Sequence, residues 1–147
     1  MSFASFPLPG SMMTYILDSS ALLRYLDGEA GDDRVRTILK AQATGDCRVV
    51  MTSVHWGELA NQLVRRHGEA LQELAMARLL DAGLEIVPAD AERAVRSACI
   101  QARLRIPYVE RFGVELAFDS SDQVFVTAAF DRKPAAAEVK IEFLPVK

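Results

Sequence analysis

The sequence has few of the residues that build disulfide frameworks or zinc sites. Its 147 residues include two cysteines, Cys47 and Cys99, which lack metal-ligand spacing. A chain of this length buries a hydrophobic core without cross-links. Both cysteines are therefore interpreted as small core residues or as free thiols of a reducing compartment. Because no apolar run is long enough to span a membrane, no membrane partner is predicted and a cytoplasmic location is expected.

Motifs of several enzyme classes are also missing. The sequence contains no Gly-rich phosphate loop, no nucleophile elbow and no Ser-His-Asp arrangement. His55 and His67 stand alone, and His55 is interpreted as a capping or hydrogen-bonded polar residue. The net charge of −3 argues against nucleic-acid binding through bulk positive charge. It does not exclude a nuclease, because a carboxylate site stays negative until a metal neutralises it.

Apolar runs alternate with amphipathic segments along the chain. The expected strands cover residues 15–17, 48–51, 84–87, 124–127 and 140–144. The expected helices cover residues 21–26, 32–43, 54–66, 69–82, 89–104 and 107–118. Strands separated by helices predict an α/β fold with a central parallel sheet of four to five strands, flanked by helices. Residues 1–13 are interpreted as a disordered leader or start extension, and residues 14–147 as a single domain.

Three acidic residues are expected at the carboxyl ends of the strands, where parallel sheets place their sites. Asp18 follows the first strand, Glu58 lies in the helix after the second, and Glu110 lies in the first turn of the helix opened by Pro107. Taken alone, Asp18 fits a helix cap equally well, and Glu58 fits a solvated surface residue. Glu110 fits either a ligand or a salt-bridge partner of a nearby arginine.

The residues around these acids resemble the motifs of PIN domains, above all those of VapC-type toxins. The resemblance covers four segments in order: 15–23, 52–60, 106–117 and 124–130. It implies a PIN-like three-layer sandwich and a metal-dependent endoribonuclease. Asp18, Glu58 and Glu110 would then be the catalytic residues and the ligands of Mg²⁺ (or Mn²⁺), two hard cations that prefer oxygen. Ser20 and Thr127 would orient water or phosphate.

The same resemblance implies an RNA substrate, a cognate antitoxin protein and a homodimer. Two positions depart from the family pattern. Glu110 stands where the family carries Asp, and Ala129 stands at the fourth acid position, with Asp131 out of register. One metal is therefore expected and a second is left open. The alternatives are a catalytically degenerate PIN domain that binds RNA or protein, and a phosphohydrolase on a similar sheet.

Overall fold

The apolar runs of the sequence form a sheet of five strands within the described residues. The structure is a computed structural model, which describes residues 12–128 and 138–145 but not the side chains of residues 101–103. The strands are β1 (Thr14–Leu17), β2 (Arg48–Thr52), β3 (Glu85–Val87), β4 (Gln123–Thr127) and β5 (Lys140–Phe143). All neighbouring strands are parallel, in the order β3-β2-β1-β4-β5. The central strands are buried on both faces, which is why they are continuously apolar.

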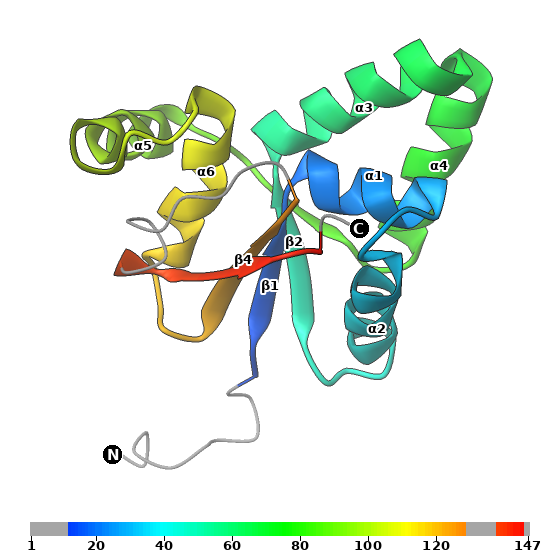
Figure 1. Cartoon of the computed structure of the whole chain (residues 1–147), viewed down its shortest axis with the longest axis horizontal. Coiled ribbons are helices and arrows are strands. Elements are labelled where there is room, and N and C mark those ends of the chain that lie inside the picture. The colour runs from blue at the N-terminus through cyan, green and yellow to red at the C-terminus, as the bar shows by residue number, and fades with distance from the viewer. Residues whose placement is uncertain (1–11, 129–137, 146–147) are drawn as a thin grey trace.

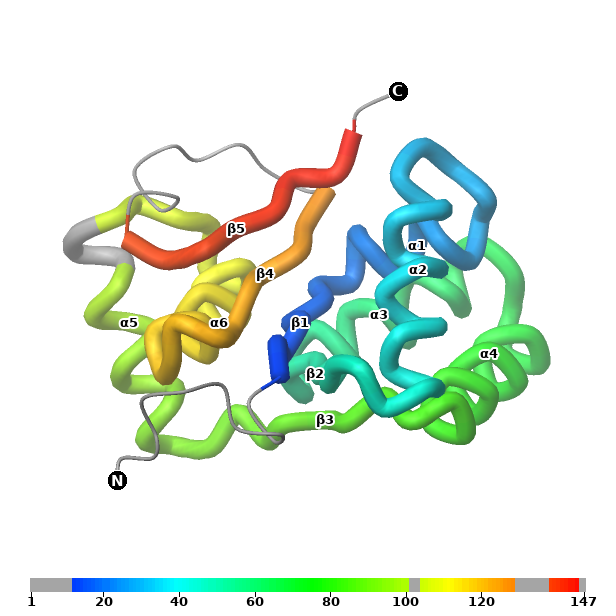
Figure 2. The backbone as a smooth tube through the Cα atoms, turned by 90° about the horizontal axis from the view of Figure 1, so that it is seen from below, coloured from blue at the N-terminus to red at the C-terminus, as the bar shows by residue number. Residues whose placement is uncertain are grey.

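Within the described residues, six helices cover the two faces of this sheet. They are α1 (Ser19–Asp27), α2 (Asp32–Ala43), α3 (Ser53–His67), α4 (Glu69–Asp81), α5 (Ala91–Leu104) and α6 (Tyr108–Ala117). Figures 1 and 2 show α5 and α6 on one side of the sheet and the other four helices on the opposite side. The expected three-layer α/β architecture is confirmed.

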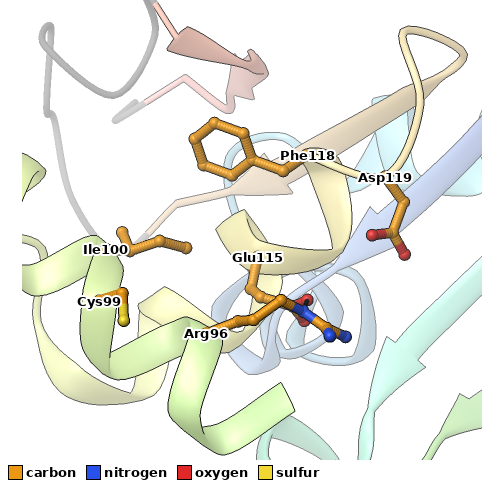
Figure 3. A pocket seen from close by; sticks show the side chains of 6 residues that line it. All are labelled: Arg96, Cys99, Ile100, Glu115, Phe118 and Asp119. Atoms are coloured by element: carbon orange, nitrogen blue, oxygen red, sulfur yellow. Dashed lines mark hydrogen bonds and ion pairs between the residues drawn. The ribbon is translucent and has the colours of Figure 1, made fainter. Parts of the chain in front are cut away.

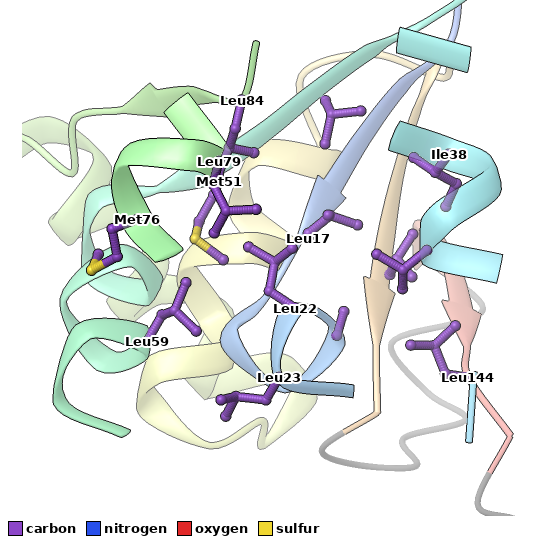
Figure 4. Close-up of a cluster of buried hydrophobic side chains, with 14 of the residues drawn as sticks. Leu17, Leu22, Leu23, Ile38, Met51, Leu59, Met76, Leu79, Leu84 and Leu144 are labelled. Atoms are coloured by element: carbon purple, nitrogen blue, oxygen red, sulfur yellow. The ribbon is translucent and has the colours of Figure 1, made fainter. Parts of the chain in front are cut away.

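A separate hydrophobic cluster fills each interface between the layers. The larger cluster joins one face of the sheet to α1–α4 and includes Leu17, Met51 and Leu59 (Figure 4). The smaller cluster joins the other face to α5 and α6 and includes Ile16 and Phe125. Adjacent residues such as Ile16 and Leu17 point to opposite faces because side chains alternate along a strand.

All the helix and strand bounds lie within two residues of those expected from the sequence, and α2 has the expected bounds. Residues 1–11 of the expected leader lie outside the described residues. Among the described helices, none has the length and apolar character needed to cross a membrane.

The strand order creates a switch point between β1 and β4. From β1 the chain builds outward through β2 and β3, and it then returns to add β4 on the other side of β1. Open α/β sheets bind ligands outside the carboxyl ends of the strands at such a point. In Figure 1 this is the upper end of the sheet, where α1 and α3 begin.

Candidate metal and catalytic site

Asp18 lies at the switch point, directly after β1, and its side chain is fully buried. It caps α1, with Oδ1 accepting the backbone N–H of Ala21 at 2.9 Å and the hydroxyl of Ser20 at 2.6 Å. Thr127, the last residue of β4, donates its hydroxyl to Oδ2. Ser20 Oγ also accepts the backbone N–H of Ala128 at 2.8 Å, so it links the start of α1 to the end of β4. Both carboxylate oxygens are thus held in fixed positions.

Glu110 enters the same site from the first turn of α6 and is 8% exposed. It shares a helix face with the small or apolar residues Gly113, Val114 and Ala117, which are also buried. Gly113 lets α6 approach the sheet closely, because a Cβ atom there would overlap the ring of Phe125. This close approach brings the Glu110 carboxylate to the ends of β1 and β2.

His55, in the first turn of α3, completes the buried part of the site. Its side chain is fully buried, and each ring nitrogen has a polar neighbour. Nδ1 lies 3.1 Å from Thr52 Oγ1, and Nε2 lies 3.2 Å from Glu110 Oε1. Thr52 is also the N-cap of α3 and accepts the backbone N–H of His55. The prediction that His55 is a hydrogen-bonded polar residue is confirmed, but its position among the acids was not predicted.

The ligand atoms of Asp18, His55 and Glu110 all lie within 4.8 Å of one another. The pKa of Asp18 is raised to about 7, chiefly by burial and also by the adjacent Glu110, and this value already includes the opposing effects of His55, Ser20 and Thr127. Burial also raises the pKa of Glu110. Burial lowers the pKa of His55, although the charges of Asp18 and Glu58 oppose this shift. Two buried carboxylates beside a histidine that burial keeps neutral form a site that favours a cation.

Glu58 lies one turn beyond His55 on α3 and is half-buried. It is not one of the three residues of the tight cluster, and Ser19 donates its hydroxyl to Glu58 Oε1. The negative charge of Glu58 raises the pKa of both His55 and Glu110, so Glu58 lies at the rim of the same site.

The structure therefore brings Asp18 and Glu110 together, with Ser20 and Thr127 bonded to Asp18 and Glu58 at the rim. Ala129 and Asp131 lie outside the described residues. Sequence reasoning missed His55 as a neighbour of the acids. The available signal was its spacing, since residues three apart on a helix share a face and His55 precedes Glu58 by three.

A cavity of about 400 Å³ lies elsewhere, between α5 and α6 (Figure 3). It is lined by Arg96, Cys99, Ile100, Glu115, Phe118 and Asp119. The buried Glu115 carboxylate accepts hydrogen bonds from Arg93 at 2.9 Å and from Arg96 at 2.8 Å. These charges neutralise one another within the protein, and the cavity contains none of the predicted site residues.

Comparisons with known proteins agree with this architecture. A chain of VapBC2 from Rickettsia felis, bound to a promoter DNA fragment, has a TM-score of 0.71 at 15% identity and covers 89% of this chain and 98% of its own. A chain of DNA-bound VapBC from Salmonella typhimurium has a TM-score of 0.69 at 15% identity, and the match covers 90% of this chain and 98% of that one. VapC20 from Mycobacterium tuberculosis, a Sarcin-Ricin loop cleaving toxin, has a TM-score of 0.61 at 22% identity, and the match covers 89% of this chain and 99% of that one. No curated protein matches the chain.

At these identities the structural likeness establishes the fold alone. The sequence itself carries the assignment further, because the family model of the PIN domain matches residues 15–138, most of the chain. The chain belongs to the PIN domain family.

Proposed function

We propose that this protein is a metal-dependent endoribonuclease of the VapC type, acting in the cytoplasm on RNA. The observation that carries the proposal is the convergence of Asp18 and Glu110 in a buried cluster at the switch point of the sheet. Solved structures of the same fold include a toxin that cleaves the Sarcin-Ricin loop, which supports a ribonuclease over other phosphoryl-transfer enzymes.

The donor set fits a divalent cation. Asp18 and Glu110 offer buried oxygens whose pKa values are raised by burial, so a cation that replaces their protons relieves an unfavourable state. Glu58 offers a third carboxylate at the rim, and we assign Asp18, Glu58 and Glu110 to Mg²⁺ or Mn²⁺. When bound, such an ion polarises a phosphate oxygen and acidifies water.

The protein's own residues position these groups. Thr127 and Ser20 hold the two oxygens of Asp18, which fixes the direction of the carboxylate, and Ser19 holds Glu58. Ser20 and Thr127 also place hydroxyls beside the acids, where we propose that they orient water or phosphate. Because catalysis of phosphodiester cleavage depends on positioning and electrostatics, this rigid frame is the feature that activity requires.

The test is cleavage of mixed tRNA and rRNA by the purified protein in Mg²⁺, Mn²⁺ or EDTA. We expect metal-dependent fragments from the wild type and none from Asp18→Asn. Asp119→Asn is the matched control, because Asp119 is exposed and pairs with Arg93 away from the site. If the folded wild type binds RNA without cutting it under any metal, the chain is instead a degenerate PIN domain that acts as a binding module.

We also propose a small antitoxin as the protein partner. An apolar cavity of about 310 Å³ lies between α1, α2 and α4, and its wall includes Leu71 and Leu74, which are 45% and 47% exposed. Exposed leucines around a hollow suit the apolar face of an amphipathic helix. We expect the protein encoded beside this gene to co-purify with the wild type and not with Leu74→Asp. Co-purification that is unaffected by this change would place the partner elsewhere.

A homodimer is the remaining part of the proposal. It rests on the resemblance to VapC-type toxins. Sedimentation velocity across a range of protein concentrations tests it, and a single monomeric species at all concentrations would contradict it.

A further inference from the structure

His55 is the feature of the site that the proposed function does not use. It is fully buried, and its ring lies against Phe125 with the centroids 6.1 Å apart. With Nδ1 at 3.1 Å from Thr52 Oγ1, the ring has little freedom to rotate. A histidine ligand of a metal commonly makes such a bond with its second nitrogen, because the bond fixes the tautomer and the direction of the free lone pair.

The hydrogen bonds allow this tautomer. Thr52 Oγ1 accepts the backbone N–H of His55 and has a second lone pair for the proton on Nδ1. Nε2 then has no proton, and its lone pair faces Glu110 Oε1 at 3.2 Å. In that arrangement Nε2 and Glu110 Oε1 are two acceptors in contact, with a ligand oxygen of Asp18 within 4.8 Å, and a proton or a cation between them removes the repulsion.

The separations fit ligands of a shared ion. At metal–ligand lengths of about 2.1 Å, two adjacent ligands lie about 3 Å apart and two opposite ligands about 4.2 Å apart. The distance of 3.2 Å between His55 and Glu110 matches adjacent ligands. The 4.8 Å limit of the whole cluster requires only a small inward movement of its side chains.

We infer that His55 Nε2 binds the metal directly, together with Asp18 and Glu110, and that the site therefore favours a transition ion such as Mn²⁺ over Mg²⁺. The inference rests on the metal-dependent part of the proposed function. Mg²⁺ prefers an all-oxygen shell and gives up its waters reluctantly, whereas an imidazole nitrogen favours first-row transition ions.

The experiment is pulsed EPR of the tag-free protein loaded with Mn²⁺, in the absence of RNA. A coordinated imidazole gives a ¹⁴N modulation, which changes when the protein is grown with ¹⁵N-histidine. The chain contains two histidines, and His67 lies at the opposite end of α3, bonded to Asp27 at 3.1 Å. His67→Gln is therefore the matched control. Because isotope labelling needs no substitution at His55, the test does not depend on whether a His55 variant folds.

We expect the histidine ¹⁴N signal in the wild type and in His67→Gln, and its loss in His55→Gln. Calorimetry should show that His55→Gln loses at least about 100-fold in Mn²⁺ affinity, since losing even an outer partner of a metal costs about 10- to 100-fold. Mg²⁺ affinity should change far less. Mn²⁺ bound without a histidine signal would overturn the ligation by His55 while leaving a metal nuclease intact. If neither Mn²⁺ nor Mg²⁺ binds the folded protein, both the inference and the metal-dependent function are wrong.

Discussion

Replacing Gly113 with alanine tests whether the close approach of α6 to the sheet holds the site together. A Cβ atom at position 113 would lie 2.7 Å from Cδ1 and Cζ of Phe125, and closer still to Cε1. Phe125 is fully buried, so its ring cannot move aside without disturbing the core. Alanine gains about 1 kcal/mol in helix propensity over glycine. Overpacking costs about 1 to 3 kcal/mol, occasionally more, and we expect it to outweigh this gain.

Gly57 provides the matched control for this substitution. It lies within α3, is exposed, and would have no atom within 4 Å of an added Cβ. Gly57→Ala should raise the free energy of unfolding by about 0.5 to 1 kcal/mol. Gly113→Ala should lower it and should also weaken Mn²⁺ binding, because Glu110 lies one turn away on the same helix. Urea denaturation followed by circular dichroism measures both variants. A Gly113→Ala protein that is as stable as Gly57→Ala would mean that the core accepts the added methyl group beside Phe125 without cost.

Three further predictions concern the buried charges. Because the pKa of Asp18 is raised from 3.8 to about 7 in the folded protein, folding favours the protonated carboxyl group. In EDTA, this stabilisation is complete below pH 3.8 and is lost as the pH rises to about 7. Metal-free Asp18→Asn should therefore melt at a higher temperature than the wild type at pH 8, and the difference should shrink at pH 5; a constant difference would contradict the shift. Thr127→Val, which removes a donor to Asp18, should weaken metal binding by about 10- to 100-fold in calorimetry while the fold is retained. Glu115→Ala should lower the free energy of unfolding in urea, because it removes the buried carboxylate that pairs with Arg93 and Arg96; unchanged stability would mean that these ion pairs contribute nothing.

The sequence was sufficient to predict the architecture because local signals coincide with the element ends. Asp18 caps α1, Pro107 precedes α6, and Gly28 ends α1 in the left-handed region at φ 67°. The buried central strands of a parallel sheet appear as short apolar runs, so periodicity and flanking residues located them. The rule that sites form at the carboxyl ends of such strands then identified Asp18 and Glu110 as neighbours.

The finer arrangement of the site was not predictable in the same way. The contact between His55 and Glu110 joins residues 55 positions apart, and it depends on how closely α6 packs against the sheet. That distance is set by Gly113 and Phe125, whose contact is also non-local. Glu58 was interpreted from its pattern as a surface residue, and its half-buried place beside Ser19 depends on the packing of α3 against α1.

Cleavage by a pair of α6 variants tests whether the reaction depends on the carboxylate cluster. Glu110 and Glu115 are both buried glutamates of the same helix, but Glu110 faces the site and Glu115 pairs with Arg93 and Arg96. The measurement is the single-turnover rate of RNA cleavage in Mn²⁺ by folded wild type, Glu110→Gln and Glu115→Gln. We expect Glu110→Gln to lose cleavage and Glu115→Gln to keep a rate close to that of the wild type. Wild-type cleavage by Glu110→Gln would contradict it, since the reaction would then not depend on the carboxylate cluster.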